Sequence, residues 1–452
     1  MAQQYDRRPP FQQAPVSAFP GAAPAPAFPV APRPAVAPAP APVPVPAFPV
    51  QPVATEIPSQ VVGPAPRAPS GEGFRFMVFT FSADGIHICE TESQYEADQT
   101  RETYLGKITM KPCRAPTFWN DLRLIIANNN PHLLVFGTQD EPSSDTYLHS
   151  KFLPHVLPGL GYRKLKSRKL SSVGTEASGI KLGRPGVKNT ASRTSVYIRY
   201  DQVEIQKEKV EMRGVLGEYG QMDLTSKDFK RKAGAICTYV WHPVYGKFAF
   251  INVELPDTLD KYQVAENKLS YGYYREIVMT ANKLFLLNMM AQFHQNIPLE
   301  NQADNLIIFG SFNYEIRAPG KTPDEIVDII SKARLEQIVE YAKTDEMSLA
   351  RRDLPLNEFN EGPANRGVNF LPTWRLARGR PQACSSAPIT ARKEECYSSL
   401  TNGLNMPGWP DRILIHQESK ARYPINCRYY ERLSTGLINE SQHAAVYAIF
   451  DM

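Results

Sequence analysis

The sequence predicts an α/β protein in which two β-sheets pack against each other and helices cover the outside. Three observations lead to this prediction. Apolar strand segments recur from residue 74 to the C-terminus, amphipathic helices separate them, and two of the strands adjoin a short turn as in a hairpin. About 380 residues take part, which is enough for one large hydrophobic core.

The N-terminal part of the chain has a different composition. Half of the 40 prolines lie before residue 70, among Ala, Val, Phe and Gln. Because proline lacks an amide donor and fixes φ, helix and sheet are both excluded there. We expect a disordered Pro/Ala-rich arm over residues 1–72 and one folded domain over residues 73–452. The arm is either a spacer or a docking segment for a Pro-recognising module.

Residues 74–81 alternate in polarity and are rich in aromatic side chains, which is typical of a strand. Residues 117–129 carry a stripe of apolar side chains and end in an asparagine run, which predicts an amphipathic helix. Further strands are expected at residues 133–136, 194–200, 235–241 and 247–255, the last two as a hairpin around the turn at 242–246.

The second half of the domain begins with a long helix over residues 266–294, whose apolar side chains recur at helical spacing. The apolar run from Leu306 to Phe309 predicts a buried strand over residues 305–312. Thr322 and Pro323 then provide an N-cap and a first helical residue, so a helix with breaks should reach about residue 352. Residues 413–416 and 445–451 are the closing strands.

Cysteine spacing and hydropathy limit the class of protein. The six cysteines show no CxxC spacing, which argues against a zinc site or a disulfide framework and fits a reducing compartment. The sequence contains no apolar run of the roughly 18 residues that a spanning helix needs. We therefore predict a cytoplasmic protein. Basic clusters at residues 162–169, 227–232 and 375–380 are either solvated faces or contacts for a phosphoinositide, an anionic membrane or a nucleic acid.

Polar residues gather where the predicted strands end. If the fold brings these strand ends to one rim, their oxygens could hold a divalent cation and a phosphate. Six pairs of polar residues lie at these strand ends. Taken singly, each pair is also consistent with polar residues that only cap a strand. The pairs are Ser82/Asp84, Gln139/Asp140, Asn252/Glu254, Ser311/Asn313, Asp411/Arg412 and Gln442/His443.

Several motifs resemble one family. Residues 309–316, Phe-Gly-Ser-Phe-Asn-Tyr-Glu-Ile, resemble the Gly-Asp-Leu-Asn-Tyr-Arg-Ile signature of the inositol polyphosphate 5-phosphatases. Residues 407–414, Pro-Gly-Trp-Pro-Asp-Arg-Ile-Leu, are similar to that family's Pro-Ala-Trp-Cys-Asp-Arg-Ile-Leu. Residues 345–347 and 361–375 add two weaker matches in the same order. The resemblance runs from Gly73 to the C-terminus and implies the endonuclease/exonuclease/phosphatase superfamily and its four-layer α/β/β/α sandwich.

The resemblance also implies roles for individual residues. It implies a Mg²⁺-dependent phosphatase site in which Asp140 is the metal ligand. The catalytic positions that it transfers are Asn252, Asn313, Asp411 and His443, and the substrate-binding positions are Lys232, Arg375 and Arg412.

Five positions depart from the family pattern: Ser82, Asp84, Glu254, Ser311 and Gln442. Ser311 replaces the aspartate that activates water, and Glu254 replaces a histidine that contacts phosphate. Gln442 replaces the aspartate of a Ser-Asp-His motif, so His443 is expected to lose its orienting carboxylate. Loss of a general base typically lowers a rate by about 10²–10⁴.

Three functions follow from this balance of kept and lost residues. The first is a pseudoenzyme that binds an inositol phosphate, a phosphoinositide or a partner protein with weak or no hydrolysis. The second is an active Mg²⁺-dependent phosphatase with a rearranged site, in which Asp84 or Glu254 takes over. The third is a nuclease of the same superfamily, which we rank last because the motifs match the inositol phosphatases better. Peripheral contact with an anionic membrane is compatible with the first two.

Overall fold

The computed structural model describes separate stretches of the chain between residues 73 and 452. The chain divides into two units, residues 1–62 and 63–452, and every described residue belongs to the second. The predicted Pro/Ala-rich arm, Asp84, Arg375 and the side chain of Lys232 lie outside the described part, so their expected roles stay predictions. Described are residues 73–83, 88–89, 113–114, 116–142, 148–149, 153–171, 174–177, 190–202, 204–205, 207–218, 229–255, 271–352, 354, 356–374, 376, 406–433 and 441–452.

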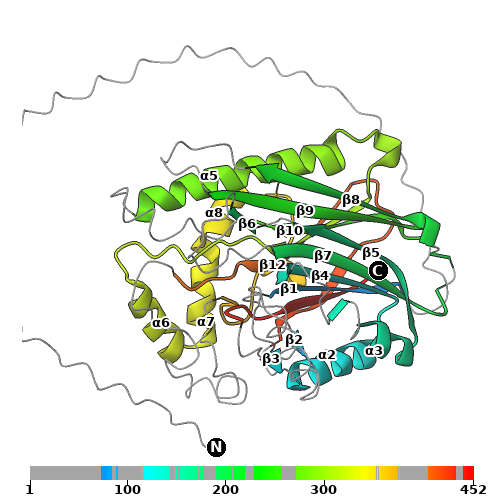
Figure 1. Ribbon diagram of the computed structural model, residues 1–452, viewed down its shortest axis with the longest axis horizontal. Helices are drawn as coiled ribbons and strands as arrows, with labels where there is room; N and C mark the ends of the chain where they lie inside the picture. Colours follow the sequence, from blue (N-terminus) through cyan, green and yellow to red (C-terminus); the bar gives the residue numbers. More distant parts are fainter. Residues whose placement is uncertain are drawn as a thin grey trace, which may run out of the picture. The chain divides into compact units, whose positions relative to one another are not determined.

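Two mixed β-sheets form the centre of the domain (Figure 1). The first has the strand order β13-β14-β1-β4-β7-β5, and the second has the order β12-β11-β10-β9-β6, with β8 also paired to β9. The first sheet comprises β1 (Arg75–Ser82), β4 (Leu133–Pro142), β5 (Tyr162–Ser171), β7 (Thr190–Arg199), β13 (Asn426–Arg432) and β14 (Val446–Asp451). The second comprises β6 (Gly174–Ala177), β8 (Val210–Glu218), β9 (Phe229–His242), β10 (Gly246–Glu254), β11 (Asn305–Ser311) and β12 (Asp411–Gln417). A short parallel pair joins β2 (Ile88–Cys89) to β3 (Cys113–Arg114).

Helices lie outside the two sheets (Figure 1). The longest, α5, crosses the second sheet and ends in a π-helical turn, Ala291–Gln295. The helices are α2 (Pro116–Asn129), α3 (Leu153–Gly159), α5 (Tyr271–Met290), α6 (Pro323–Lys332), α7 (Leu335–Val339) and α8 (Glu346–Arg352), with 3₁₀ turns at Lys207–Lys209, Leu299–Asn301, Glu340–Thr344 and Pro363–Asn365. Among the described helices, none has the length and apolarity to cross a membrane. The predicted four-layer α/β/β/α sandwich is confirmed.

Three apolar layers hold the sandwich together. Phe76 and Val78 of β1 point between the sheets, whereas Met77 and Phe79 point outward to α2. Both faces of the central strands are therefore buried, which explains the continuous apolar run that predicted β11. The middle layer includes Phe250 and Phe309, the α2 layer includes Phe118, Trp119 and Leu122, and the α5 layer includes Phe285, Leu286 and Met289.

The predicted elements are all present where the structure describes them, and six strands and one helix were missed. These are β2, β3, β5, β6, β8, β13 and α3. β5 coincides with the first basic cluster, and it is an edge strand, where charged side chains are normal. The Nζ of Lys166 donates to the carbonyl of Val210 at 2.7 Å, and Arg168 donates to the carbonyl of Met212 at 2.6 Å. Part of this basic cluster therefore ties the edges of the two sheets together.

The turn between β9 and β10 depends on a buried histidine. Nδ1 of His242 accepts the backbone N–H groups of Val244 at 3.1 Å and Tyr245 at 3.2 Å. The ring packs against the ring of Phe74, with 4.9 Å between centroids. Burial, assisted by the neighbouring His132, lowers the pKa of His242 to about 4. Burial also lowers the pKa of His149, whose ring contacts Thr138 and Ser195 at 2.8 Å each.

We predict that acid weakens the fold through these histidines before the carboxylates protonate. The unfolded chain binds a proton on each histidine below about pH 6.5, and the folded chain does not, so stability falls as pH drops. Lowering the pH from 7 to 5 should reduce the free energy of unfolding by about 1–2 kcal/mol for His242 alone. Urea titrations of wild type and His242→Asn, which keeps an acceptor without titrating, check this. An equal pH dependence in both proteins would contradict it.

Candidate functional site

Both sheets end in polar side chains at the same end of the sandwich. Glu254, Ser311 and Asp411 are register partners on the adjacent strands β10, β11 and β12. Paired residues of neighbouring strands point to one face, and here that is the face toward the first sheet, which Phe250 and Phe309 share. Ser82 and Gln139 are register partners on the first sheet. We call the set Ser82, Gln139, Asn252, Glu254, Ser311 and Asp411 the polar rim.

Hydrogen bonds join the two sheets across the polar rim. Nε2 of Gln139 donates to Oδ1 of Asn252 at 2.5 Å, and Nδ2 of Asn252 donates to the carbonyl of Arg193 at 3.0 Å. Both side chains are fully buried. A Cβ at Gly137 would lie 2.3 Å from the ring of Phe309, so only glycine lets the sheets approach this closely. Asn252, predicted to be catalytic, is thus a bridge that fixes the spacing of the two sheets.

Asp411 and His443 form a buried pair across the sandwich. Oδ2 of Asp411 lies 2.9 Å from Nδ1 of His443 and accepts the hydroxyl of Thr373, also at 2.9 Å. The expectation that Gln442 leaves His443 without an orienting carboxylate is therefore wrong. The carboxylate comes from β12, 32 residues earlier in the sequence, rather than from the adjacent residue. This pair holds the imidazole in one orientation.

The second oxygen of Asp411 is unusual. Asp411 is fully buried, yet its Oδ1 has no hydrogen-bond partner within the described part of the chain. A buried carboxylate oxygen without a partner is costly, so native proteins rarely keep one without a reason. Its place in the polar rim, in register with Ser311, marks this oxygen as a contact for a ligand, a water molecule or a cation.

Ser311 occupies the position to which the sequence resemblance assigns a water-activating aspartate. Its hydroxyl donates to Oδ1 of Asn313 at 3.0 Å, and Nδ2 of Asn313 donates to the carbonyl of Leu255. Gly310, at φ +139°, allows the strand to turn here, because a Cβ would lie 1.9 Å from the carbonyl oxygen of Val253. Asn313 itself adopts φ +53°. The position thus presents a hydroxyl and an amide, neither of which is a base at neutral pH.

Glu254 is the carboxylate that faces the first sheet. Its Oε2 accepts the hydroxyl of Ser192 and, at 3.2 Å, the backbone N–H of Asp140. Asp140 adopts φ +48° in a bulge of β4, which turns its amide toward Glu254. Ser192 was not predicted, because a serine in a run of Ser and Thr gives no functional signal. Glu254 and Asp140 therefore lie in one neighbourhood, at the edge of the polar rim.

Ser82 and Gln442 contribute to the rim in different ways. Ser82 is buried, and its carbonyl accepts the hydroxyl of Ser441 at 3.1 Å. The same hydroxyl accepts the backbone N–H of His443 at 3.0 Å, so it links β1 to the histidine. The carbonyl of Gln442 accepts the N–H of Leu376 at 2.9 Å, and its side chain is half-buried. These contacts position His443.

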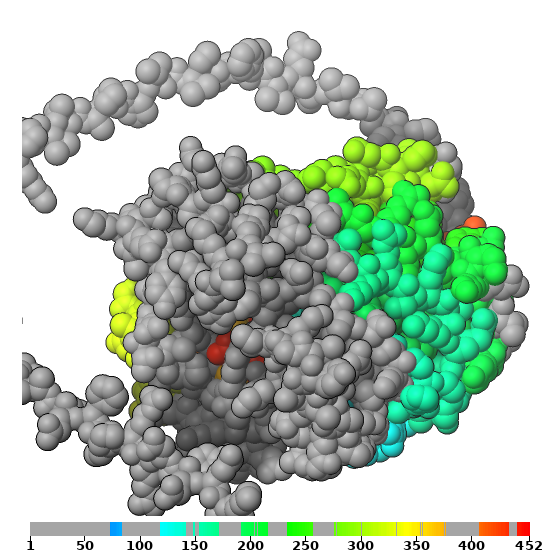
Figure 2. Space-filling view, viewed as in Figure 1, coloured from blue at the N-terminus to red at the C-terminus, as the bar shows by residue number. Residues whose placement is uncertain are grey.

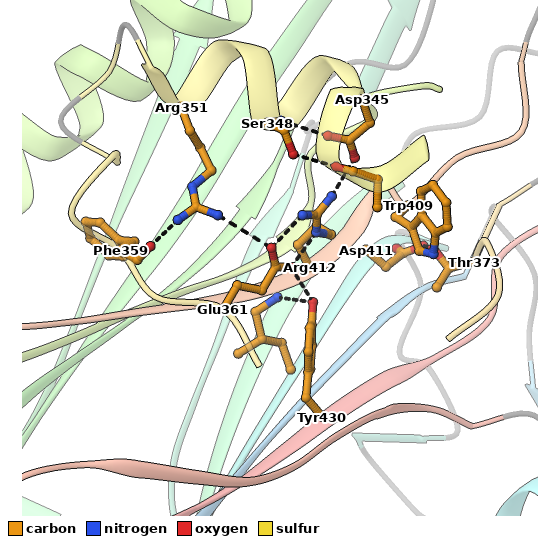
Figure 3. Close-up of polar contacts among 12 residues, drawn as sticks. Asp345, Ser348, Arg351, Phe359, Glu361, Thr373, Trp409, Asp411, Arg412 and Tyr430 are labelled. Atoms are coloured by element: carbon orange, nitrogen blue, oxygen red, sulfur yellow. Dashed lines mark hydrogen bonds and ion pairs between the residues drawn. The ribbon is translucent and has the colours of Figure 1, made fainter. Parts of the chain in front are cut away.

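Arg412 follows Asp411 and therefore points to the other face of β12. Figure 3 shows its guanidinium between two carboxylates. Nε and Nη2 donate to the two oxygens of Glu361, each at 2.5 Å, and Nη1 donates to Asp345 at 2.7 Å. Tyr430 also donates to Glu361, at 2.8 Å. Arg412 is 1% exposed. Its predicted role in substrate binding does not fit this placement, because the guanidinium is turned to buried partners.

The charges of this cluster depend on one another. Burial alone would raise the pKa of Glu361, but the charge and hydrogen bonds of Arg412, with Arg351 beside it, hold that pKa below its usual value. The two carboxylates raise the pKa of Arg412 against the effect of burial, so it stays charged. Arg351 reaches Glu361 at 3.5 Å. The sequence motifs at 345–347, 361–375 and 407–414 thus supply a structural core beside Asp411.

The described residues contain no group of three or more His, Cys, Asp or Glu side chains arranged to hold a metal ion. Mg²⁺ needs fewer protein ligands, since it is usually bound by one or two carboxylates together with water and substrate phosphates. Asp140 and Glu254 could supply the carboxylates, and Asp411 adds a buried oxygen that has no hydrogen-bond partner among the described residues. This donor set fits an open Mg²⁺ site and not a closed protein cage.

The two mixed sheets with helices outside agree with the family that a comparison of the sequence identifies. Residues 188–449, more than half of the chain, match the model of the Endonuclease/Exonuclease/phosphatase family 2. The chain belongs to this family, and the predicted superfamily is confirmed. Members of this superfamily typically use divalent metal ions.

Solved structures with a similar chain path are remote in sequence. The inositol polyphosphate 5-phosphatase domain of SpSynaptojanin, in complex with inositol (1,4)-bisphosphate and calcium ion, is 14% identical over 84% of each chain, with a TM-score of 0.47. Cimex nitrophorin, in a ferrous NO complex, is 14% identical over 84% of this chain and 98% of its own, with a TM-score of 0.46. ANGEL2, a 2',3'-cyclic phosphatase, is 13% identical over 84% and 96%, with a TM-score of 0.33. A search of curated proteins finds no match. Likeness at this level carries no information on substrate.

We predict that Arg412 serves stability. Arg412→Met leaves Asp345 and Glu361 buried without their cation, which should lower the free energy of unfolding by about 3–5 kcal/mol. The triple variant Arg412→Met/Asp345→Asn/Glu361→Gln removes the stranded charges and should recover part of that loss. Urea unfolding measures both. Unchanged stability in Arg412→Met, with weaker binding of phosphate ligands, would instead favour the substrate-binding role.

Proposed function

We propose that the domain binds an inositol phosphate or the head group of a phosphoinositide at the polar rim and hydrolyses it weakly or not at all. One observation carries the proposal. Ser311, in register between Glu254 and Asp411, places a hydroxyl where the resembled family has its catalytic aspartate. A serine hydroxyl cannot take a proton from water at neutral pH. The motifs at 309–316 and 407–414 support the choice of ligand class.

The retained residues define what the site can still do. Asp411 fixes the imidazole of His443 through Nδ1, so Nε2 points away from the pair and toward the position of a ligand oxygen. The Oδ1 of Asp411, for which the described part of the chain supplies no hydrogen-bond partner, adds a second contact point. Lys232 and Arg375 stay predicted cationic contacts for phosphate. These groups can orient a phosphate ester, but a site without a general base is slower by about 10²–10⁴.

Asp140 and Glu254 would hold Mg²⁺ in this proposal. When bound, the ion neutralises phosphate charge and acts as a Lewis acid on a phosphoryl oxygen. Glu254 is held in place by Ser192 and by the backbone of Asp140, so its position does not depend on the ion. In the absence of a cation, the carboxylate of Glu254 lies close to the ligand position and repels phosphate.

One observation favours an active Mg²⁺-dependent phosphatase as the second candidate. The Asp411–His443 pair is intact. The site therefore keeps an orienting carboxylate for His443, which the presence of Gln442 in place of an aspartate had suggested was lost. In this alternative Glu254 is the carboxylate that replaces the missing aspartate. A nuclease gains no such support. Lys166 and Arg168 of the basic strand β5 bind carbonyls of β8, which leaves fewer of its charges for a nucleic acid.

We predict that hydrolysis returns when the family residues are restored. Ser311→Asp alone places a carboxylate between Glu254 and Asp411, where repulsion should keep it protonated and limit the gain. Ser311→Asp/Glu254→His removes the part of that repulsion that comes from Glu254 and should release phosphate from inositol (1,4)-bisphosphate with Mg²⁺ at least about 10² times faster than wild type.

The matched control is Ser311→Asn/Glu254→His, which fills the same space without a base. Colorimetric phosphate release from all variants, with and without Mg²⁺, gives the comparison. Fast release by the wild-type protein, abolished by Asp411→Ala, would refute the proposal of weak hydrolysis and establish the second candidate.

We predict that Glu254 weakens ligand binding when no cation is present. Glu254→Gln keeps the shape of the side chain and removes its charge, which should strengthen binding of inositol (1,4)-bisphosphate in EDTA by about tenfold. In Mg²⁺ the same change should weaken binding, because a ligand of the ion is lost. Titration calorimetry under both conditions tests this. The same affinity for both proteins in both buffers would exclude Glu254 from the site.

A further inference from the structure

The sandwich carries a second distinctive surface at the end away from the polar rim. β10 runs from Gly246 to Glu254, so Lys247 lies seven residues, or roughly 23 Å, from the rim. Trp241 is the register partner of Lys247 on β9. We call Lys209, Trp241, Lys247, Leu299 and Lys420 the far-rim patch. The chain's C-terminus follows β14 at this same end (Figure 1).

The far-rim patch exposes two large apolar side chains. Trp241 is 42% exposed and Leu299 is 76% exposed. The other three tryptophans, Trp119, Trp374 and Trp409, are each 8% exposed or less. Figure 2 shows this end at the right of the view, where β5 in blue-green, the neighbouring green strands and the yellow-green end of α5 form the coloured surface. Apolar side chains that gather among cations mark a contact surface more strongly than scattered ones do.

Lysines frame these apolar side chains. Nζ of Lys209 lies 4.5 Å from the centroid of the Trp241 ring. Lys247 donates to the carbonyl of Asn301, and Lys420 donates to the carbonyl of Leu299 at 3.0 Å, so Lys247, Leu299 and Lys420 belong to adjoining segments. Each ammonium group has three donors. Lys420 uses two of them, because it also donates to the carbonyl of Gln302 at 3.2 Å, so Lys209 and Lys247 retain more donors for an anion.

Three acidic residues near the patch, Asp304, Glu211 and Glu418, have partners within the protein, whereas Glu208 is exposed beside Lys209 and next to the equally exposed Lys207. Asp304 accepts the backbone N–H of Lys247 at 2.7 Å and lies 3.7 Å from Nζ of Lys420. Glu211 pairs with Arg213 at 2.6 Å. Glu418 contacts His294 at 2.8 Å. Because Asp304 lies against Lys420, the outward positive charge of the patch comes mainly from Lys209 and Lys247.

We propose that the far-rim patch docks the domain on an anionic lipid bilayer. Tryptophan favours the interface of a membrane, where its ring is buried and its N–H stays wet. A leucine that is three-quarters exposed gains by entering the acyl boundary, and lysines attract anionic head groups by about 1 kcal/mol each. A nucleic acid could contact the lysines and the indole, but it has no apolar layer in which the leucine side chain would be buried.

This inference is independent of the proposed function, because no residue of the polar rim belongs to the patch. Docking through this end directs the polar rim away from the bilayer. The ligand of the polar rim would then reach it from solution, which favours a free inositol phosphate over a membrane lipid.

The exposure of Trp241 provides a direct test with the full chain. Since the other tryptophans are buried, vesicles of phosphatidylcholine with about one-third phosphatidylserine should shift the emission to shorter wavelength through Trp241 alone. Vesicles of phosphatidylcholine alone should leave the emission wavelength unchanged. The shift should also be absent in Trp241→Phe. Co-sedimentation should weaken by about fivefold for Lys209→Glu and again for Leu299→Ser, and should weaken with salt.

Matched controls use side chains outside the patch. Lys332→Glu on α6 and Leu284→Ser on α5 change exposed residues, with a side-chain exposure of 74% for Lys332 and an exposure of 62% for Leu284, and should leave co-sedimentation unchanged. Equal co-sedimentation of wild type and of the patch variants would overturn the proposal. An equal emission shift with a soluble oligonucleotide, unaffected by Leu299→Ser, would overturn it in favour of a nucleic-acid contact.

Discussion

The hydrogen bond between Gln139 and Asn252 is the interaction on which the arrangement of the site depends. In the interior of the sandwich, away from the edge formed by β5 and β8, the two sheets meet through apolar side chains, which are tolerant of small shifts. At the polar rim they meet through buried amides whose donors and acceptors must be matched, since an unmatched buried amide is costly. This requirement fixes the distance between β4 and β10. The spacing of Glu254, Ser311 and Asp411 relative to the first sheet follows from it.

Neighbouring residues of β12 carry out two different tasks. Asp411 points into the rim and holds His443, whereas Arg412 points away and holds Glu361 and Asp345. An ion cluster of this kind adds little net stability, but it is strongly disrupted when one partner is lost. Its effect here is positional, because it anchors the strand at the residue next to Asp411. The motif at residues 407–414 can therefore be kept because it stabilises the strand, even when the catalytic residues of the neighbouring polar rim have changed.

Periodicity was sufficient to predict the central strands and the main helices, because these segments are buried on defined faces. β5 could not be found in this way, since its sequence Tyr-Arg-Lys-Leu-Lys-Ser-Arg-Lys-Leu-Ser lacks an apolar face and its basic side chains serve a sheet edge. At the site, the described strand ends lie at one end of the sandwich, as the pattern of polar residues predicted, whereas the functional roles of these residues and the place of Asp84 stay predictions. The partner of His443 was not, because residue-by-residue comparison looks for it beside His443, and the fold supplies it from β12. Ser192 gave no signal at all.

The two ends of the sandwich differ in a way that constrains how such a domain can work. At the polar rim, charge is buried and almost every donor has a partner, so binding there requires a ligand that satisfies a few defined atoms, such as Oδ1 of Asp411. At the far-rim patch, charge and apolar surface are exposed on Lys209, Trp241 and Leu299, which suits a fluid, anionic surface with no fixed geometry. One rigid set of strands connects the two ends. A contact at the patch would therefore orient the rim without altering it, so that location and ligand recognition could change independently.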